Sequence, residues 1–386
     1  MSNINIIESS EIASHSYQEN WAICYENGAE KDLKKSFHWY KKAAEYGYVT
    51  AMNNLANCYE NGEGTERDLK EAFYWYQKAA VRGNVTAMNN LAIWYENGKG
   101  TEKDLEKAFC WYQKAAERGF KEAMFSLAIC YENGKGTDKD LKKTFYWYQK
   151  AAEGGYANAM NNLAICYKNG KGTEKNLKKA FYWHQKMAES GNVNAMNNLA
   201  FYYENGRGIK KDLKKAFYWY QKAAEGDNVN AMCNLAICYK NGEGTEKDLK
   251  KAFYWYQKAA EDGFKKAAFS LANCYDNGKG TEKNLMKAFF WYQKAAESDN
   301  VKAMFNLAIY YENGKGTEKN LERAFHWYQK AAECDYINAM NNLAICYENG
   351  EGTEKDLKKA FYWYQKAANG GNINAMSNLA ICYENG

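Results

Sequence analysis

Residues 68–100 read DLKEAFYWYQKAAVRGNVTAMNNLAIWYENGKG, and a recognisable copy of this stretch returns every 36 residues to the end of the chain. Single positions show the period clearly. Tryptophans keep this interval from Trp39 to Trp363, and tyrosines keep it from Tyr59 to Tyr383. A fixed period of about 20–50 residues is the signature of a stacked array, in which one unit cannot bury its apolar face alone. The sequence therefore predicts a solenoid.

Each repeat contains two segments with helical spacing. The apolar residues of the first segment recur three and four positions apart, at Leu69, Ala72, Phe73, Tyr76, Ala79 and Ala80. This spacing predicts a helix over about 69–82, which we call helix B, with Asp68 as N-cap and Gly83 as a left-handed stop. The second segment, with Ala87, Met88, Leu91, Ala92 and Tyr95 on one face, predicts a helix over about 85–96, which we call helix A.

The loop that joins helix A to the next helix B carries two glycines, such as Gly62 and Gly64, which we expect to adopt positive φ angles. Small residues on the helices let their axes approach closely, and aromatic residues fill the remaining gaps. In the first full repeat, the expected small residues are Ala56, Ala72 and Ala79, and the expected aromatic residues are Tyr59, Trp75 and Tyr76.

Composition favours one elongated, folded domain. The chain has 386 residues, of which 46% are hydrophobic and 16% aromatic, and both values exclude a disordered chain. No apolar run approaches the roughly 18 residues of a membrane span. The net charge of +5 comes from lysine and glutamate that alternate within each repeat, as in residues 352–360, so we expect a solvated surface and no nucleic-acid partner.

The cysteines indicate a reducing environment. Eight of them share one repeat position, where other repeats carry tryptophan or tyrosine, so the position is one of packing. They are Cys24, Cys58, Cys130, Cys166, Cys238, Cys274, Cys346 and Cys382. The N-terminal residues lack the basic and apolar blocks of a signal peptide. We therefore expect buried free thiols and a cytoplasmic protein.

The repeat has the pattern A-x3-LA-x2-Y-x2-G-x-G-[TI]-x2-[DN]-L-x2-[AT]-x2-WY-x-KAA. Residues 231–260 match this pattern, and residues 159–188 match it except at His184 and Met187. The pattern resembles the Sel1-like repeat, a relative of the tetratricopeptide repeat. The resemblance covers residues 17–386. It implies an all-α, right-handed superhelical solenoid of about ten to eleven 36-residue helix-turn-helix repeats. Helix A would line the concave side and helix B the convex side. Residues 1–16 are expected to form a polar, frayed N-terminal segment, with a first helix from around Ser10.

The resemblance implies a non-enzymatic scaffold or adaptor between proteins. Some bacterial members carry two cysteines per hairpin and are linked to penicillin binding or β-lactam hydrolysis, which we keep as an alternative. Helix B here lacks its cysteine except at Cys110, so that oxidised group is a poor match. The four histidines, His15, His38, His184 and His326, lie in different repeats. The sequence therefore predicts no catalytic residues, no metal site and no cofactor.

Aligned to the tetratricopeptide pattern, one position of helix A faces the concave groove; we call this series the asparagine column. Our candidate binding residues in it are Asn53, Asn89, Phe125, Asn161, Asn197, Phe269, Phe305 and Asn341, and Cys233 and Ser377 occupy the same position. One helical turn on lies the isoleucine column, which comprises Asn57, Ile93, Ile129, Ile165, Phe201, Ile237, Asn273, Ile309, Ile345 and Ile381.

Asparagine can donate to and accept from the backbone of an extended peptide, and isoleucine offers apolar contacts. We therefore predict a groove that binds a peptide or a helix of a protein partner. The alternative is that the asparagines are inherited repeat filler with compositional bias, and that the isoleucines pack between repeats. A further alternative is an RNA-binding array of helical hairpins, but the next position is mostly acidic, as at Glu96 and Glu132, and would repel phosphates.

The chain ends after a helix A, which leaves Leu379, Ala380 and Tyr383 without the helix B that covers their counterparts. An apolar end without a cap lowers solubility. We expect that the natural product is longer, that the end self-associates, or that it docks on another domain.

Overall fold

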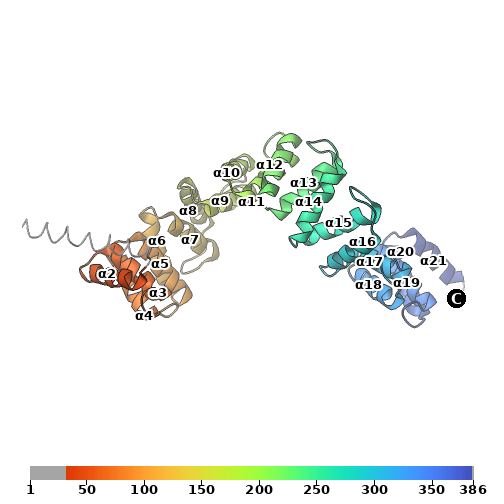
Figure 1. The fold of residues 1–386 in the computed structure, drawn as a ribbon, viewed down its shortest axis with the longest axis horizontal. Coiled ribbons are helices and arrows are strands. Elements are labelled where there is room, and N and C mark those ends of the chain that lie inside the picture. The colour runs from red at the N-terminus through yellow and green to blue at the C-terminus, as the bar shows by residue number, and fades with distance from the viewer. Residues whose placement is uncertain (1–31, 385–386) are drawn as a thin grey trace, which may run out of the picture. The chain divides into compact units, whose positions relative to one another are not determined.

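The computed structural model of the chain describes residues 32–384, which form twenty α-helices and no strand (Figure 1). The first expected helix, around Ser10, and the atypical first copy of the repeat before residue 32 lie outside the described residues. In chain order the helices are α2 (Leu33–Glu45), α3 (Val49–Asn61), α4 (Leu69–Val81), α5 (Val85–Asn97), α6 (Leu105–Glu117), α7 (Lys121–Asn133), α8 (Leu141–Glu153), α9 (Ala157–Asn169), α10 (Leu177–Glu189), α11 (Val193–Asn205), α12 (Leu213–Glu225), α13 (Val229–Asn241), α14 (Leu249–Glu261), α15 (Lys265–Asn277), α16 (Leu285–Ala296), α17 (Val301–Asn313), α18 (Leu321–Glu333), α19 (Ile337–Asn349), α20 (Leu357–Asn369) and α21 (Ile373–Glu384).

Odd-numbered helices are helix A of the repeat, and even-numbered helices are helix B. The bounds expected for the second repeat, 69–82 and 85–96, are confirmed to within one residue by α4 and α5. None of the helices in the described part of the chain has the length and apolar character that a bilayer crossing requires.

Local side-chain chemistry starts and stops these helices. The Asp68 carboxylate accepts hydrogen bonds from the amides of Lys70 and Glu71, as expected of an N-cap. Gly83 follows α4 with a φ of +98°, and the C-cap of α5, Gly98, has a φ of +67°. Both values lie in the left-handed region that favours glycine. The predicted cap and glycine stops are therefore confirmed.

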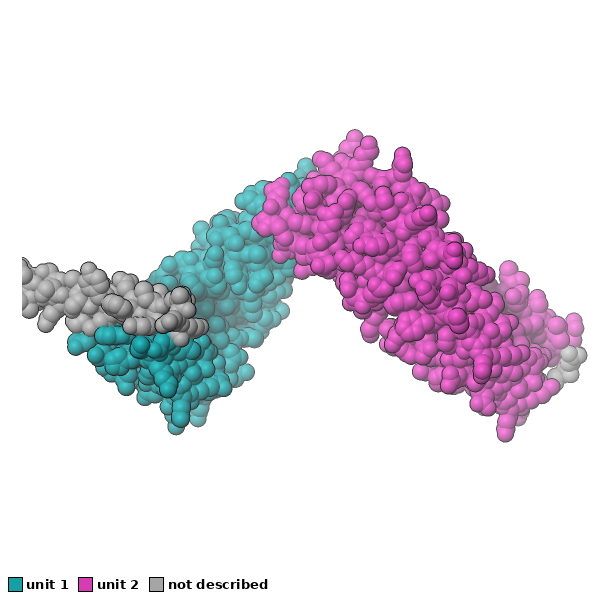
Figure 2. Space-filling model, viewed as in Figure 1, with its two compact units in different colours: residues 1–187 teal, residues 188–386 magenta. Residues whose placement is uncertain are grey.

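The structure divides into two compact units, residues 1–187 and 188–386 (Figure 2). Within each unit, the main interfaces join helices that are neighbours in the sequence, as expected of an array that grows in one dimension.

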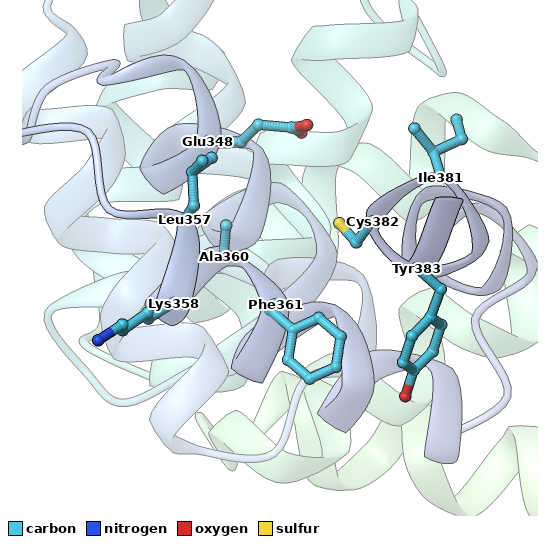
Figure 3. Close-up of a pocket in the computed structure, with 8 residues that line it drawn as sticks. All are labelled: Glu348, Leu357, Lys358, Ala360, Phe361, Ile381, Cys382 and Tyr383. Atoms are coloured by element: carbon cyan, nitrogen blue, oxygen red, sulfur yellow. The ribbon is translucent and has the colours of Figure 1, made fainter. Parts of the chain in front are cut away.

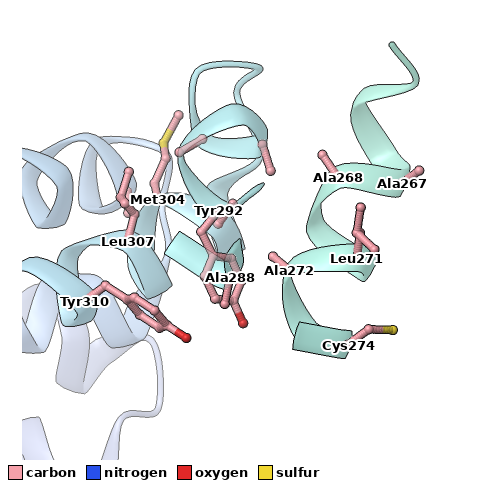
Figure 4. Packing of buried hydrophobic residues seen from close by; sticks show 14 of the residues in the cluster. Ala267, Ala268, Leu271, Ala272, Cys274, Ala288, Tyr292, Met304, Leu307 and Tyr310 are labelled. Carbon is pink, nitrogen blue, oxygen red and sulfur yellow. The ribbon is translucent and has the colours of Figure 1, made fainter. Parts of the chain in front are cut away.

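Small and aromatic residues share the core of each unit. Ala56, Ala72 and Ala79 are fully buried, and Tyr76 is almost so, as predicted. Figure 4 shows the same arrangement in the second unit, where Ala288 and Tyr292 of α16 lie between side chains of α15 and α17. A buried tyrosine removes about 150–250 Å² from water, which is worth about 4–6 kcal/mol as an upper bound. Tyrosine and alanine together therefore lock successive helices.

The second glycine of each helix A to helix B loop is required by a close backbone approach. A Cβ atom on Gly136, which has a φ of +67°, would lie 2.0 Å from the carbonyl oxygen of Leu105. Gly119 has a comparable φ of +90°, but a Cβ there would meet no atom within 4 Å. A side chain at Gly119 would therefore add backbone strain alone, whereas one at Gly136 would add both strain and a steric clash.

We expect Gly119→Ala to destabilise the protein by about 1 kcal/mol, because it adds only the strain of a left-handed conformation. Gly136→Ala adds a clash with backbone and is expected to cost about 3 kcal/mol or more. Urea unfolding followed by circular dichroism measures both losses. Equal losses for the two variants would show that the close approach does not constrain the loop.

Candidate protein-interaction surface

A buried tyrosine of helix B makes a polar bridge to the preceding helix A. The hydroxyl of Tyr112 in α6 donates to Oε2 of Glu96 in α5 over 2.9 Å. Nζ of Lys135, in the loop after α7, donates to Oε1 of the same carboxylate over 2.9 Å. The Glu96 carboxylate therefore connects three elements: α5 itself, the following helix α6, and the loop after α7. Tyrosine and carboxylate are paired in the same way in Tyr76–Glu60, Tyr148–Glu132, Tyr220–Glu204, Tyr328–Glu312 and Tyr364–Glu348.

The bridge changes the pKa of its members. Burial acts to raise the pKa of Glu96, but hydrogen bonds from Lys135 and Tyr112 outweigh burial and leave it below its usual value. The pKa of Glu132 is lowered by the same balance, with Lys171 and Tyr148 as donors. Burial raises the pKa of Tyr112, and its contact with the Glu96 carboxylate raises it further. Near neutral pH the carboxylates are ionised and the tyrosines carry their protons.

Two hairpins depart from this chemistry. Lys168 stands at the carboxylate position in α9, and there the helix-B tyrosine is also replaced, by His184. Burial, helped by the charge of Lys168, lowers the pKa of His184 to about 4, so the imidazole is neutral. Lys240 in α13 also replaces a carboxylate, but its helix-B partner remains a tyrosine, Tyr256.

The asparagine column is less uniform than its outward-facing position predicts. Asn53, Asn89 and Asn341 are buried, and their Oδ1 atoms have no hydrogen-bond partner among the described residues. Asn161 and Asn197 are half-buried, and Oδ1 of Asn197 accepts from Asn234 over 3.1 Å. The expectation of an exposed amide is therefore wrong for the first three. Neighbouring hairpins cover those side chains.

The three phenylalanines of the asparagine column are half-buried against tyrosines that follow them in the chain, in a helix or at a helix N-cap. The ring of Phe125 lies 5.2 Å from that of Tyr156, and the ring of Phe305 lies 5.2 Å from that of Tyr336. Phe269 lies 6.0 Å from Tyr292. Each ring is therefore partly covered by aromatic packing and partly accessible to solvent.

The isoleucine column is the more exposed of the two. Ile93, Ile165 and Ile237 are 38–39% exposed, and Phe201 is 38% exposed at the same position. Ile129, Ile309 and Ile345 are half-buried. An apolar surface thus runs along helix A in each unit.

Two features of the surface were not predicted from the sequence. The second asparagine of the Asn-Asn pair contacts the bridge tyrosine, as Asn90 does with Tyr76. Helix B also carries exposed aromatic rings at one repeat position, each packed edge-on against the next tryptophan, as in Tyr146 and Trp147. The 36-residue recurrence of Tyr74 and its counterparts was the signal that could have revealed this second row.

The cysteine prediction is confirmed for the described residues. Cys130, Cys166, Cys238, Cys274 and Cys346 are free and buried, Cys58 is buried, and Cys382 is half-buried. Cys24 lies outside the described residues. Burial raises the pKa of the Cys130 thiol to about 12, so the thiol stays protonated. Among residues 32–384, no three histidine, cysteine or acidic side chains gather as metal ligands would.

The last two helices, α20 and α21, enclose a pocket of about 550 Å³ (Figure 3). Phe361 and Tyr383 lie on one side of it, and Ile381 and Cys382 on α21 form another wall. Tyr383 is 65% exposed, whereas its repeat counterpart Tyr347 is buried.

Helical hairpins in succession, with apolar and amide side chains along one helix of each pair, define a helical-repeat protein. The chain belongs to the Sel1 repeat family. The family model matches residues 15–48, 49–84, 85–120, 121–156, 157–192, 193–228, 229–264, 265–300, 301–336, 337–372 and 373–386. The predicted resemblance and the all-α repeat fold are confirmed. Proteins of this family are mostly non-enzymatic scaffolds for protein interactions.

Solved structures agree with this assignment. The chain is 30% identical to c5321, a protective antigen of uropathogenic Escherichia coli with an SLR fold, with a TM-score of 0.72 over 100% of this chain and 91% of that one. It is 26% identical to a Sel1 repeat protein of Oxalobacter formigenes, with a TM-score of 0.66 over 80% of this chain and 89% of that one. The comparison with curated proteins found no match.

The lowered pKa of Glu96 predicts a pH-dependent contribution to stability. A lowered folded pKa means that the contribution is present above the unfolded value of 4.5 and is lost as the pH falls through the folded value. Glu96→Gln should therefore lower the melting temperature by about 2–4 °C near pH 7, and the difference from wild type should shrink at about pH 3. Glu102→Gln, the same change in an exposed loop residue, is the control. A Glu96→Gln deficit of equal size at both pH values would contradict the assignment.

Proposed function

We propose that this protein is a scaffold or adaptor that binds peptide or helical segments of partner proteins along its helix-A face. We define this face as the asparagine and isoleucine columns together. The observation that carries the proposal is the exposure of Ile93, Ile165, Phe201 and Ile237. At 38–39% exposure, each of these residues leaves apolar surface in contact with water, so an apolar series at this position suits contact with another molecule.

Amide groups beside the apolar series would supply polar contacts. Asn161 and Asn197 are the accessible asparagines, so their side chains are the ones proposed to hydrogen-bond a peptide backbone. Phe125, Phe269 and Phe305 would add aromatic contact area. Binding of this kind requires no catalytic group, and we propose none. The buried free thiols favour a reducing compartment, and we propose the cytoplasm.

A matched pair of variants tests which face binds. A library of short random peptides is selected on the full chain, and the best peptide is measured against wild type, Ile165→Glu and Tyr146→Glu. Ile165 is 39% exposed on helix A and Tyr146 is 49% exposed on helix B of the same unit. We expect Ile165→Glu to weaken binding by about tenfold or more, because a carboxylate would be desolvated in the complex, and Tyr146→Glu to leave it unchanged.

Thermal melting shows that both variants are folded before binding is compared. Loss of binding in Tyr146→Glu alone would move the site to helix B and overturn the proposal. Failure to select any peptide that binds the folded chain would overturn it as well.

We also propose that the surface around the α20–α21 pocket binds a second copy of this chain. Leu357, Ile381 and Tyr383 are 60%, 51% and 65% exposed there, and two copies placed together would cover them. Sedimentation velocity should show a concentration-dependent dimer of wild type that Tyr383→Glu shifts to monomer. A wild-type chain that stays monomeric at high concentration would refute this association.

A further inference from the structure

One hairpin of the second unit lacks the carboxylate that the others provide. In other hairpins of this unit the bridge tyrosine donates to an acidic residue: Tyr220 donates to Glu204 over 3.0 Å, and Tyr328 donates to Glu312 over 3.0 Å. In the hairpin of α13 and α14, the residue at that position is Lys240. Tyr256 is retained and buried, so the donor remains while the acceptor has been replaced by a cation.

The same replacement also removes the carboxylate with which a second lysine would pair. In the first unit, lysines 39 positions after the bridge carboxylate pair with it, in Lys99–Glu60, Lys135–Glu96 and Lys171–Glu132. The counterpart of these lysines for Lys240 of α13 is Lys279, which lies 39 positions later in the loop after α15. Two ammonium groups therefore stand where these three hairpins of the first unit place one ammonium and one carboxylate.

These side chains line one cavity of about 310 Å³. Its polar lining consists of Lys240, Lys279, Lys302, Tyr256, Ser270, Asn273 and Asn277, and its apolar lining consists of Leu249, Ala252, Phe269 and Cys274. Three of these residues are cationic and none is acidic. Burial raises the pKa of the Cys274 thiol while Lys240 and Lys279 act to lower it, which places both charges close to this wall of the cavity.

Nearby acidic groups are engaged in their own bridges. Asp276 accepts a hydrogen bond from Tyr292 over 3.3 Å, and Glu204 accepts from Tyr220. The Asn273 side chain is also held in place, because its Nδ2 donates to the Phe269 carbonyl and its Oδ1 accepts from Tyr292. The positive cavity is thus bounded by ordered groups and is not neutralised from its own lining.

We propose that this cavity binds a carboxylate group of a peptide ligand. The ligand carboxylate takes the place of the missing glutamate side chain. It accepts from the Tyr256 hydroxyl and is held by the ammonium groups of Lys240 and Lys279, with Lys302 of α17 as a third cation in the lining. The inference rests on the proposed function, since Phe269 belongs both to the cavity and to the asparagine column of the helix-A face.

Carboxylate is the chemistry that the fold itself selects at this place. In the first unit, the same lysine position and the same tyrosine position converge on a carboxylate, with 2.9 Å from Lys135 and 2.9 Å from Tyr112 to Glu96. A group of that size and charge therefore fits between such donors. A peptide can supply it from its C-terminus or from an aspartate or glutamate side chain, and the two sources are separated by the test.

The key variant is Lys240→Glu, which restores the residue that the other hairpins carry. We expect it to raise the melting temperature by about 2 °C or more, because it replaces repulsion between two cations with a bridge, and to abolish carboxylate binding. Most substitutions of an exposed lysine would change stability little. Lys250→Glu is the matched control: Lys250 is exposed on α14, does not line the cavity, and the change in net charge is identical.

The ligands are four synthetic versions of the strongest peptide selected on the wild-type chain: free or amidated at the C-terminus, and with its acidic residues retained or changed to glutamine or asparagine. We expect at least one carboxylate-bearing version to bind wild type about tenfold more tightly than the version without carboxylates. That advantage should vanish in Lys240→Glu, fall in Lys279→Met and persist in Lys250→Glu. Loss on amidation identifies the C-terminus as the source, and loss on glutamine substitution identifies a side chain.

Competition by small carboxylate compounds is an independent test of the site. N-acetylglutamate should displace the carboxylate-bearing peptide from wild type, whereas N-acetylglutaminamide, in which both carboxyl groups are amides, should not. If all four versions bind alike and Lys240→Glu has no effect, the carboxylate site is wrong while peptide binding on the helix-A face stands. If no peptide binds at all, both proposals fail. Inorganic phosphate that competes better than N-acetylglutamate would also overturn the carboxylate assignment.

Discussion

The hydroxyl of the helix-B tyrosine is buried, and its bond to a carboxylate on the preceding helix A is the constraint around which most of the described repeats are arranged. A buried hydroxyl without a partner costs about 1–3 kcal/mol. Tyr112 meets this requirement through Glu96, and the carboxylate in turn receives Lys135 from the next loop. The ring supplies apolar area, and the alanines beside it allow close approach of the helices. In the first unit the polar bridge also links residues at three repeat positions: the tyrosine, the carboxylate and a lysine.

This bridge changes how the charge of the helix-A face is understood. From the sequence, the glutamates that follow the isoleucine column appear as a free acidic row. In the structure, Glu60, Glu96 and Glu132 each receive a lysine and a tyrosine hydroxyl, so their charge is largely neutralised within the fold. In the second unit the residues 39 positions after Glu204 and Glu312 are themselves acidic, Glu243 and Glu351, so the charge of the face varies from repeat to repeat. Where lysine replaces the carboxylate, as at Lys240, positive charge is left for another molecule to neutralise.

Those parts of the fold that depend on short-range chemistry could be predicted from the sequence. The bounds of α4 and α5, the Asp68 cap and the positive φ of Gly98 follow from residues within one or two turns of each other. The burial of individual asparagines could not be predicted in this way. Asn53 and Asn161 share a repeat position, yet one is buried and the other half-buried, because side chains of adjacent hairpins decide how much of each amide is covered.

The same limit applies to the bridge. Tyr112 and Glu96 are 16 residues apart, and Lys135 is 39 residues from the glutamate, so helical periodicity within one element does not bring them together. All three recur with the repeat, but recurrence alone does not distinguish a core contact from a solvated surface. Packing of successive hairpins was needed to show that the lysine, tyrosine and carboxylate positions converge.

A repeat array can acquire a specific site by a single replacement, because neighbouring repeats maintain the geometry of the one that changes. Helices α13 to α15 have the same lengths and spacing in the sequence as their counterparts, and Tyr256 and Lys279 line one cavity with Lys240. At Lys168 the partner tyrosine has changed as well, to His184, whose neutral ring offers a different set of bonds. Lys240 has kept its partner tyrosine, and Lys168 has not. This difference is expected if, of the two hairpins, only that of Lys240 retains a tyrosine hydroxyl that donates to an external carboxylate. Selectivity along such a face then depends on which repeats depart from the pattern, and on whether the partners of the departing residue are kept.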